Sequence, residues 1–70
     1  MDALFVFVGR DSWDRPVYAW EGRYYVDTDP RAHQQPRLFT KYQNAFDGEP
    51  NNPIPDSIKV TFSPTRDTWR

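Results

Sequence analysis

Hydrophobic residues alternate with polar ones, or run together in short blocks, at a spacing that is typical of β-strands. Residues 3–8 (ALFVFV) are apolar at every position, so both faces of a strand formed there would be hydrophobic. Such a strand is expected at the centre of a sheet that is covered on both sides, or in a sheet whose second face is buried by a partner. Gly9 is expected to end this strand.

The strongest local signal predicts a hairpin over residues 16–27. Two β-favouring runs flank the dipeptide Glu21-Gly22, which predicts a two-residue turn. In that register Trp20 opposes Arg23, and a type I′ turn would give Glu21 a positive φ. Alternation then separates two faces of the hairpin. One face carries Tyr18, Trp20, Arg23 and Tyr25, and the other, predicted to face the core, carries Val17, Ala19, Tyr24 and Val26.

The second half of the chain is less regular. Residues 38–46 fit either a strand or two turns of helix, and the β-favouring residues at the start favour a short strand over 38–42. The stretches 28–36 and 48–56 hold most of the prolines and are predicted to be loops, with Ile54 reaching the core from the second loop. A one-sided strand is expected beyond them, because apolar and polar positions alternate over 57–62.

These elements predict a mainly β fold for a single small domain over residues 1–70. We expect either a small antiparallel meander sheet or an SH3-like, partly open barrel of four or five short strands with long, proline-rich loops. The expected strands are 3–8, 16–20, 23–27, 38–42 and 57–62. Composition supports this fold class, because the good helix formers Leu, Glu and Lys occur twice each while Val and Thr occur five times each.

Size and charge narrow the function classes. A chain of 70 residues with no cysteine and one histidine has neither a disulfide nor a thiolate metal site, so aromatic burial or self-association must stabilise it. Nine basic and ten acidic residues are interspersed and give a net charge of −1, which disfavours a general nucleic-acid binder or a binder of anionic membranes. Apolar runs are far too short for a membrane span or a secretion signal, so a cytoplasmic protein is expected.

No catalytic motif and no cofactor or metal site is apparent. His33 lies in a polar loop with no nucleophile placed beside it by a motif, so an exposed loop residue is expected. Two carboxylate pairs, Asp27 with Asp29 and Asp47 with Glu49, could serve a hydrolase or a Ca²⁺ ion, but they lack a full calcium-loop pattern and a small domain offers little cleft. Turn formation and pairing with arginine are the favoured roles for these acids.

One short sequence recurs. Residues 10–13 (RDSW) follow the first predicted strand and residues 66–69 (RDTW) follow the last. If these two strands run parallel and adjacent, both tetrapeptides emerge at the same edge of the sheet. Coincidence, or two turns that use the same Asp chemistry, is the favoured alternative, because a match of four residues is weak.

The remaining signal is an excess of large rings and guanidinium groups. Arginine outnumbers lysine seven to two, and there are three Trp and four Tyr; these residue types dominate protein interfaces. We therefore expect a non-catalytic accessory module that binds a protein partner or itself. The alternatives are that the rings fill the core, that they stack single-stranded nucleic acid with help from Arg10, Arg15 and Arg23, or, least favoured, that the chain is a small hydrolase. The candidate binding residues are Trp13, Tyr18, Trp20, Arg23, Tyr25 and Trp69.

Overall fold

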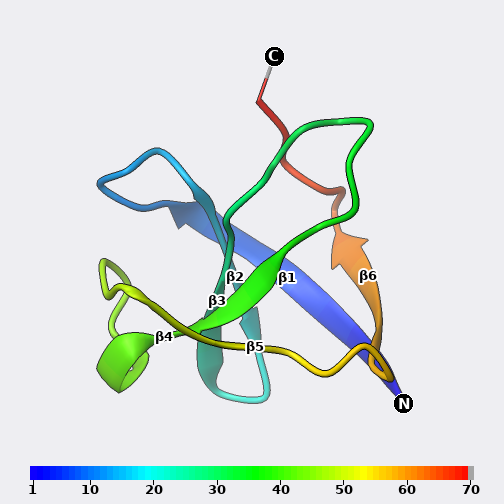
Figure 1. Ribbon diagram of the computed structural model, residues 1–70, viewed down its shortest axis with the longest axis horizontal. Coiled ribbons are helices and arrows are strands. Elements are labelled where there is room, and N and C mark those ends of the chain that lie inside the picture. The colour runs from blue at the N-terminus through cyan, green and yellow to red at the C-terminus, as the bar shows by residue number, and fades with distance from the viewer. Residues whose placement is uncertain (70) are drawn as a thin grey trace.

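A computed structural model describes residues 1–69, which form one six-stranded sheet that is strongly curled and not closed into a barrel (Figure 1). The order of strands across the sheet is β5-β4-β3-β2-β1-β6. Neighbouring strands are antiparallel, except that β1 and β6 are parallel. The mainly β prediction is confirmed. The elements are β1 (Asp2–Arg10), β2 (Pro16–Trp20), β3 (Arg23–Asp27), β4 (Leu38–Lys41), the 3₁₀ turn η1 (Tyr42–Asn44), β5 (Pro50–Pro53) and β6 (Lys59–Ser63).

The predicted hairpin is present with the predicted register. Strands β2 and β3 pair Val17 with Val26 and, at the turn, Trp20 with Arg23. Glu21 has φ 49° and Gly22 has φ 79°, as a type I′ turn requires. Local sequence therefore determines this element almost completely.

Strand β1 runs further than the sequence predicts. Gly9 does not end the strand, because pairing with β2 continues to Arg10 after a shift in register between Phe7 and Gly9. Gly9 has a φ of 148° and a Cβ placed there would lie 3.3 Å from Cζ of Phe46. The glycine thus makes a β-bulge that lets the Phe46 ring approach the sheet.

Three other predictions are corrected. The structure has six strands, because Pro50–Pro53, expected in a loop, pairs with β4 as β5. Proline is tolerated there because β5 is at the edge of the sheet, where its missing N–H is not needed. The antiparallel meander is wrong for the last strand, since β6 lies parallel to β1. The strand expected over 38–42 ends at Lys41, and the following residues form η1.

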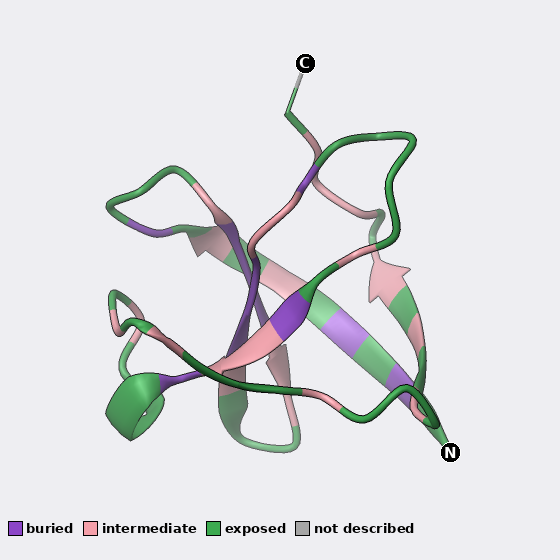
Figure 2. Cartoon of the chain, in the orientation of Figure 1, coloured by how far each residue is buried: buried purple, intermediate pink, exposed green. Residues whose placement is uncertain are grey.

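The core lies inside the curl of the sheet and is largely aromatic. Phe5 is completely buried, and its ring centroid lies 4.8 Å from that of Tyr25, 5.7 Å from that of Trp20 and 6.3 Å from that of Tyr18. Figure 2 shows the buried residues concentrated on the strands at the centre of the sheet. The fully or mostly buried cluster is Ala3, Phe5, Tyr18, Tyr25 and Leu38, and the half-buried residues packed against it are Phe7, Trp20, Ile54, Ile58, Val60 and Phe62.

The two faces of the hairpin are therefore not divided as the sequence suggests. The face with Tyr18 and Tyr25 is the inner one, although Val17 and Val26 on the outer face are also completely buried. A thinner second layer forms on the outer face, where the Phe46 ring packs edge-on against Tyr24. The hairpin is covered on both sides, so its own alternation could not identify the side of the main core.

Two buried carboxylates hold loops onto the sheet. Asp11 accepts a hydrogen bond from Nζ of Lys41 at 2.6 Å, and both side chains are completely buried. Asp27, also completely buried, accepts a hydrogen bond from Nε of Arg66 at 3.1 Å. Within residues 1–69, every buried side-chain nitrogen or oxygen has a hydrogen-bond partner. Each carboxylate thus links elements that are distant in the sequence.

Within the described residues, no helix is long and apolar enough to cross a membrane.

Candidate functional site: a groove beside strand β6

The aromatic and arginine candidates lie in three separate places rather than on one contact face. Tyr18 and Tyr25 are buried in the core, so they are not available to a partner. Burial raises the pKa of the Tyr18 hydroxyl, which accepts a hydrogen bond from the backbone N–H of Asp67. Trp20 is half-buried at the mouth of the core, and Arg23, its cross-strand neighbour, is exposed. The interpretation of this hairpin face as an exposed binding surface is therefore wrong for its two tyrosines.

The two tryptophans outside the hairpin are exposed at the other end of the sheet. Trp13 is 58% exposed and Trp69 is 41% exposed. The indole Nε1 of Trp69 donates to the carbonyl oxygen of Asp14 at 2.9 Å, and the guanidinium of Arg15 lies 5.1 Å from the Trp13 ring centroid. Both rings are thus held by neighbours and remain candidates for contact with a partner.

The repeated tetrapeptides, 10–13 and 66–69, do emerge at the same end of the sheet, because β1 and β6 are parallel neighbours. They bind each other directly: the guanidinium of Arg10 donates to both carboxylate oxygens of Asp67, at 2.7 and 3.1 Å. This contact and the pairing of Arg10 with Asp14 raise the Arg10 pKa above its usual value. The observed role of the repeat is to fasten the end of the chain to the loop after β1.

Arg10, Arg15 and Arg23 do not gather into one basic surface. Arg10 and Arg15 form ion pairs with aspartates at one end of β2. Arg23 lies at the opposite end of β2, beside Trp20. The patch of Arg10, Arg15 and Arg23 that would support nucleic-acid binding is therefore not assembled, and the guanidinium charge at the Arg10 end is largely neutralised.

Three of the four carboxylates considered for a hydrolase or a metal, Asp27, Asp29 and Asp47, have structural partners. Asp27 accepts hydrogen bonds from Arg66 and from two backbone N–H groups, and Asp47 accepts one from the backbone N–H of Ser12. Across residues 1–69, no three or more His, Asp or Glu side chains are grouped so that they could hold a metal ion. These acids position loops, as their preference for turns suggests.

The two edges of the sheet differ in a way that bears on function. Strand β5 begins and ends with proline, which blocks pairing with a further strand. Strand β6 pairs with β1 on one side, and no strand of residues 1–69 pairs with its other side, which we call the free edge. No proline interrupts Lys59–Ser63. One edge is protected from strand addition and the other is not.

The register of β6 shows which backbone groups face the free edge. The N–H of Lys59 donates to the carbonyl oxygen of Met1, so Lys59 and the residues at every second position after it direct their backbone groups towards β1. Val60 and Phe62 lie between these positions, and their N–H and C=O groups face outwards. An unpaired row of donors and acceptors therefore runs along the free edge.

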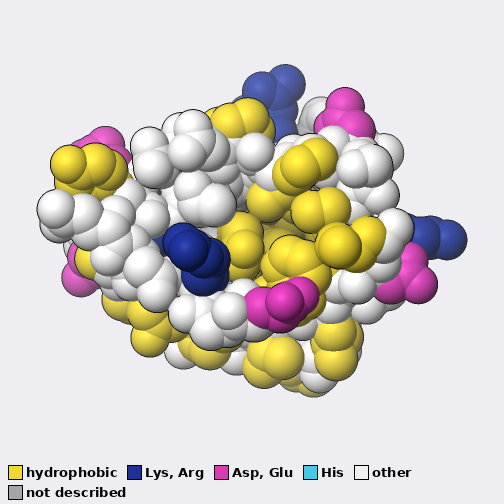
Figure 3. Space-filling view, turned by 90° about the horizontal axis from the view of Figure 1, so that it is seen from below, with side chains coloured by type: hydrophobic (Ala, Val, Ile, Leu, Met, Phe, Trp, Pro, Cys, Tyr) yellow, Lys and Arg dark blue, Asp and Glu magenta, His cyan; other side chains and the backbone are white. Residues whose placement is uncertain are grey.

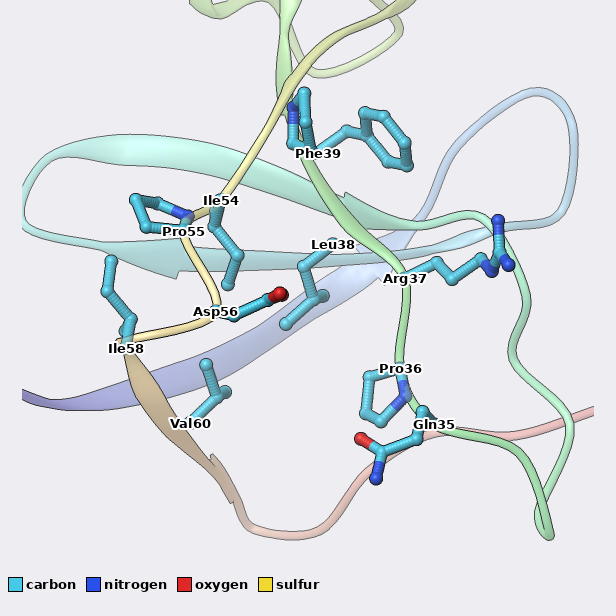
Figure 4. Close-up of a pocket in the computed structure, with 11 residues that line it drawn as sticks. Gln35, Pro36, Arg37, Leu38, Phe39, Ile54, Pro55, Asp56, Ile58 and Val60 are labelled. Atoms are coloured by element: carbon cyan, nitrogen blue, oxygen red, sulfur yellow. The ribbon is translucent and has the colours of Figure 1, made fainter.

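A groove of about 420 Å³ lies beside the free edge (Figure 4). One wall is formed by the end of the loop before β4 and by β4 itself, and the other by the segment that leads from β5 into β6. Eight of its eleven lining residues are hydrophobic, and hydrophobic side chains also gather at the end of the molecule where the β2–β3 turn lies (Figure 3). The lining residues are Gln35, Pro36, Arg37, Leu38, Phe39, Pro53, Ile54, Pro55, Asp56, Ile58 and Val60.

Sequence reasoning identified the parts of this groove but not the groove itself. The one-sided strand at 57–62 and the core contact of Ile54 were both predicted, and Ile54 does pack against the core. The missing information was the order of strands, which places β6 at an edge and opposite the loop before β4. A pattern of alternation does not reveal whether a strand has one neighbour or two.

Comparison of the chain with protein-family models, with curated proteins and with solved structures finds no match.

Proposed function

We propose that this protein is a binding module that takes up an extended peptide segment of a partner protein by strand addition at the free edge of β6. The observation that carries the proposal is the outward row of backbone groups on Val60 and Phe62 beside the apolar groove. Strand addition needs both features: main-chain hydrogen bonds supply affinity, and pockets for alternate side chains supply specificity. The proposal keeps the protein-binding hypothesis and moves the binding site from the hairpin to the groove beside the free edge of β6.

The shape of the groove favours a single extended segment as the occupant. Residues 35–38 form the far wall, so the edge of β6 borders a slot within the chain itself. One peptide strand can enter such a slot, whereas β6 of a second folded copy would bring its own β1 with it. A peptide bound there would extend the sheet from β6 towards β4 and partly close the curl.

The proposal is tested with a library of random eight-residue peptides displayed on phage. Peptides that bind the chain are expected to alternate apolar and polar residues. Val60→Pro, which removes one outward N–H but none that bonds β1, is expected to weaken the selected peptides about tenfold, as loss of a backbone hydrogen bond and of close approach implies. Binding is measured by isothermal titration with synthetic peptides.

Thr61→Val is the matched control, because Thr61 lies on the outer face of the same strand and its backbone groups face β1. It is expected to leave peptide affinity within a factor of two. Equal losses in the two variants, or no enriched peptides, would overturn the proposal. A concentration-dependent dimer that Val60→Pro abolishes would also overturn it, by making a second copy the occupant. If Val60→Pro does not fold, amide exchange of Val60 and Phe62 in the complex of the unmodified chain with a selected peptide tests strand addition instead.

Hydrogen exchange in the unbound chain provides an independent prediction. The amide hydrogen of Thr61, which faces β1, is expected to exchange at least tenfold more slowly than those of Val60 and Phe62, which face outwards. Nuclear magnetic resonance after transfer into heavy water measures each amide. Uniform protection along β6 would show that its outer edge is already covered.

A further inference from the structure

Resting on the proposed strand-addition site, we infer that the groove selects peptides that place a cationic group, the side chain of Lys or Arg, beside Asp56. Asp56 lies in the turn before β6, where the N–H of Ile58 donates to the carbonyl oxygen of Pro55 at 3.1 Å. Figure 4 shows its carboxylate directed into the groove, between the apolar side chains of Leu38 and Ile58. A charged group in this position determines which ligand side chain can lie next to it.

Asp56 differs from the other aspartates that border the loops. Its side chain makes no hydrogen bond or ion pair within residues 1–69, whereas the carboxylates that fasten the loops each have a partner. Asp47 accepts a hydrogen bond from the backbone N–H of Ser12, and the others are bound by an arginine or lysine. The paired group comprises Asp11, Asp14, Asp27, Asp29 and Asp67. The charge of Asp56 is therefore available to a ligand.

The nearby basic residues are not placed to neutralise this charge. Arg37 lines the same groove, but its side chain extends away from Asp56 (Figure 4). Lys59 is exposed and occupies a β6 position that alternates with the inward-facing Val60. The groove consequently presents a negative group among apolar walls, which is complementary to a cation and unfavourable for a second carboxylate.

Lysine and arginine suit this environment in a second respect. Their aliphatic stems can lie along apolar surface while the charged head remains at the border with solvent. Ile54 and Leu38 supply such a surface within the groove. We expect a lysine beside Asp56 to improve affinity by up to about fivefold over glutamine, in the range of exposed ion pairs, and we expect this gain to shrink at high salt.

The test repeats the peptide selection with three proteins: the unmodified chain, Asp56→Asn and Asp56→Lys. Asp56 is exposed, so both variants are expected to fold, and their thermal transitions are compared with that of the unmodified chain as a check. The unmodified chain is expected to enrich Lys or Arg at one position of the peptide. Asp56→Asn should lose this enrichment, and Asp56→Lys should enrich Asp or Glu at the same position.

Synthetic peptides with an acetylated N-terminus separate the two sources of positive charge. If the preference for Lys persists after acetylation, the Lys side chain is the cation that Asp56 binds. If acetylation abolishes the preference, Asp56 binds the N-terminal ammonium of the peptide instead, and the assignment to Lys or Arg is overturned. Peptides that bind with no charge preference, equally to the unmodified chain and to Asp56→Asn, would overturn this inference and leave strand addition standing. Failure of any peptide to bind would overturn both.

Discussion

Replacement of Phe5 by alanine is expected to remove a large part of the chain's free energy of unfolding. The Phe5 ring is completely buried and lies within 6.3 Å of the ring centroids of Tyr18 and Phe62, with closer aromatic neighbours on β2 and β3. Removing such a ring costs about 3–5 kcal/mol, and a domain of this size has a total free energy of unfolding of about 4–10 kcal/mol. Circular dichroism during a thermal or urea transition measures the loss.

Leu4→Ala is the matched control for Phe5→Ala. Leu4 is the next residue of β1, but its side chain lies on the outer face and is 53% exposed. Its truncation is expected to cost less than about 1 kcal/mol, as for surface positions generally. Similar losses in the two variants would show that the outer face of β1 is covered, and would contradict the assignment of the core to the inner face.

Replacement of Asp11 by alanine is expected to cost about 3–5 kcal/mol, because it leaves the Lys41 ammonium buried without its counter-charge. The two groups are 2.6 Å apart and neither side chain is accessible to solvent. In the double variant with Lys41→Met, which removes both charges, part of the stability is expected to return. Urea unfolding at neutral pH measures the stability of the unmodified chain and of both variants. A double variant no more stable than Asp11→Ala would contradict this interpretation.

The same pair makes stability depend on acid. Burial opposes ionisation of Asp11, but the contacts with Lys41 and Arg15 outweigh it and hold the pKa of the carboxyl below its usual 3.8. A depressed pKa contributes stability that is present above about pH 3.8, the value of the unfolded chain, and is lost as pH falls through the lower folded value. The chain with both Asp11 and Lys41 replaced by uncharged residues is expected to lose stability less steeply below pH 4.

The hairpin could be predicted from the sequence because its signals are local. Glu21-Gly22 fixes the turn, and the turn fixes the pairing of Trp20 with Arg23. The fold class followed from composition and from the short alternating runs. The position of each strand and the pairing within the hairpin are therefore determined by residues that are close in the sequence.

The site could not be predicted because it depends on contacts between distant residues. Tyr18 is an inner residue because its ring packs against Phe5 of β1 and Phe62 of β6, two strands that are distant in the sequence and lie together on one side of the hairpin. Proline in Pro50–Pro53 is typical of a loop, and only an edge position permits it in β5. The groove and the free edge exist because β6 pairs with β1 rather than with β4. The alternation of apolar and polar residues does not indicate which strand β6 pairs with.

Amide exchange at the free edge, measured with and without a selected peptide, tests strand addition most directly. If the peptide backbone pairs with β6, the amide hydrogens of Val60 and Phe62 are expected to become at least tenfold more protected in the complex, while that of Thr61, already bonded to β1, changes little. A peptide that binds tightly but leaves Val60 and Phe62 exchanging as they do in the unbound chain would contradict the central claim.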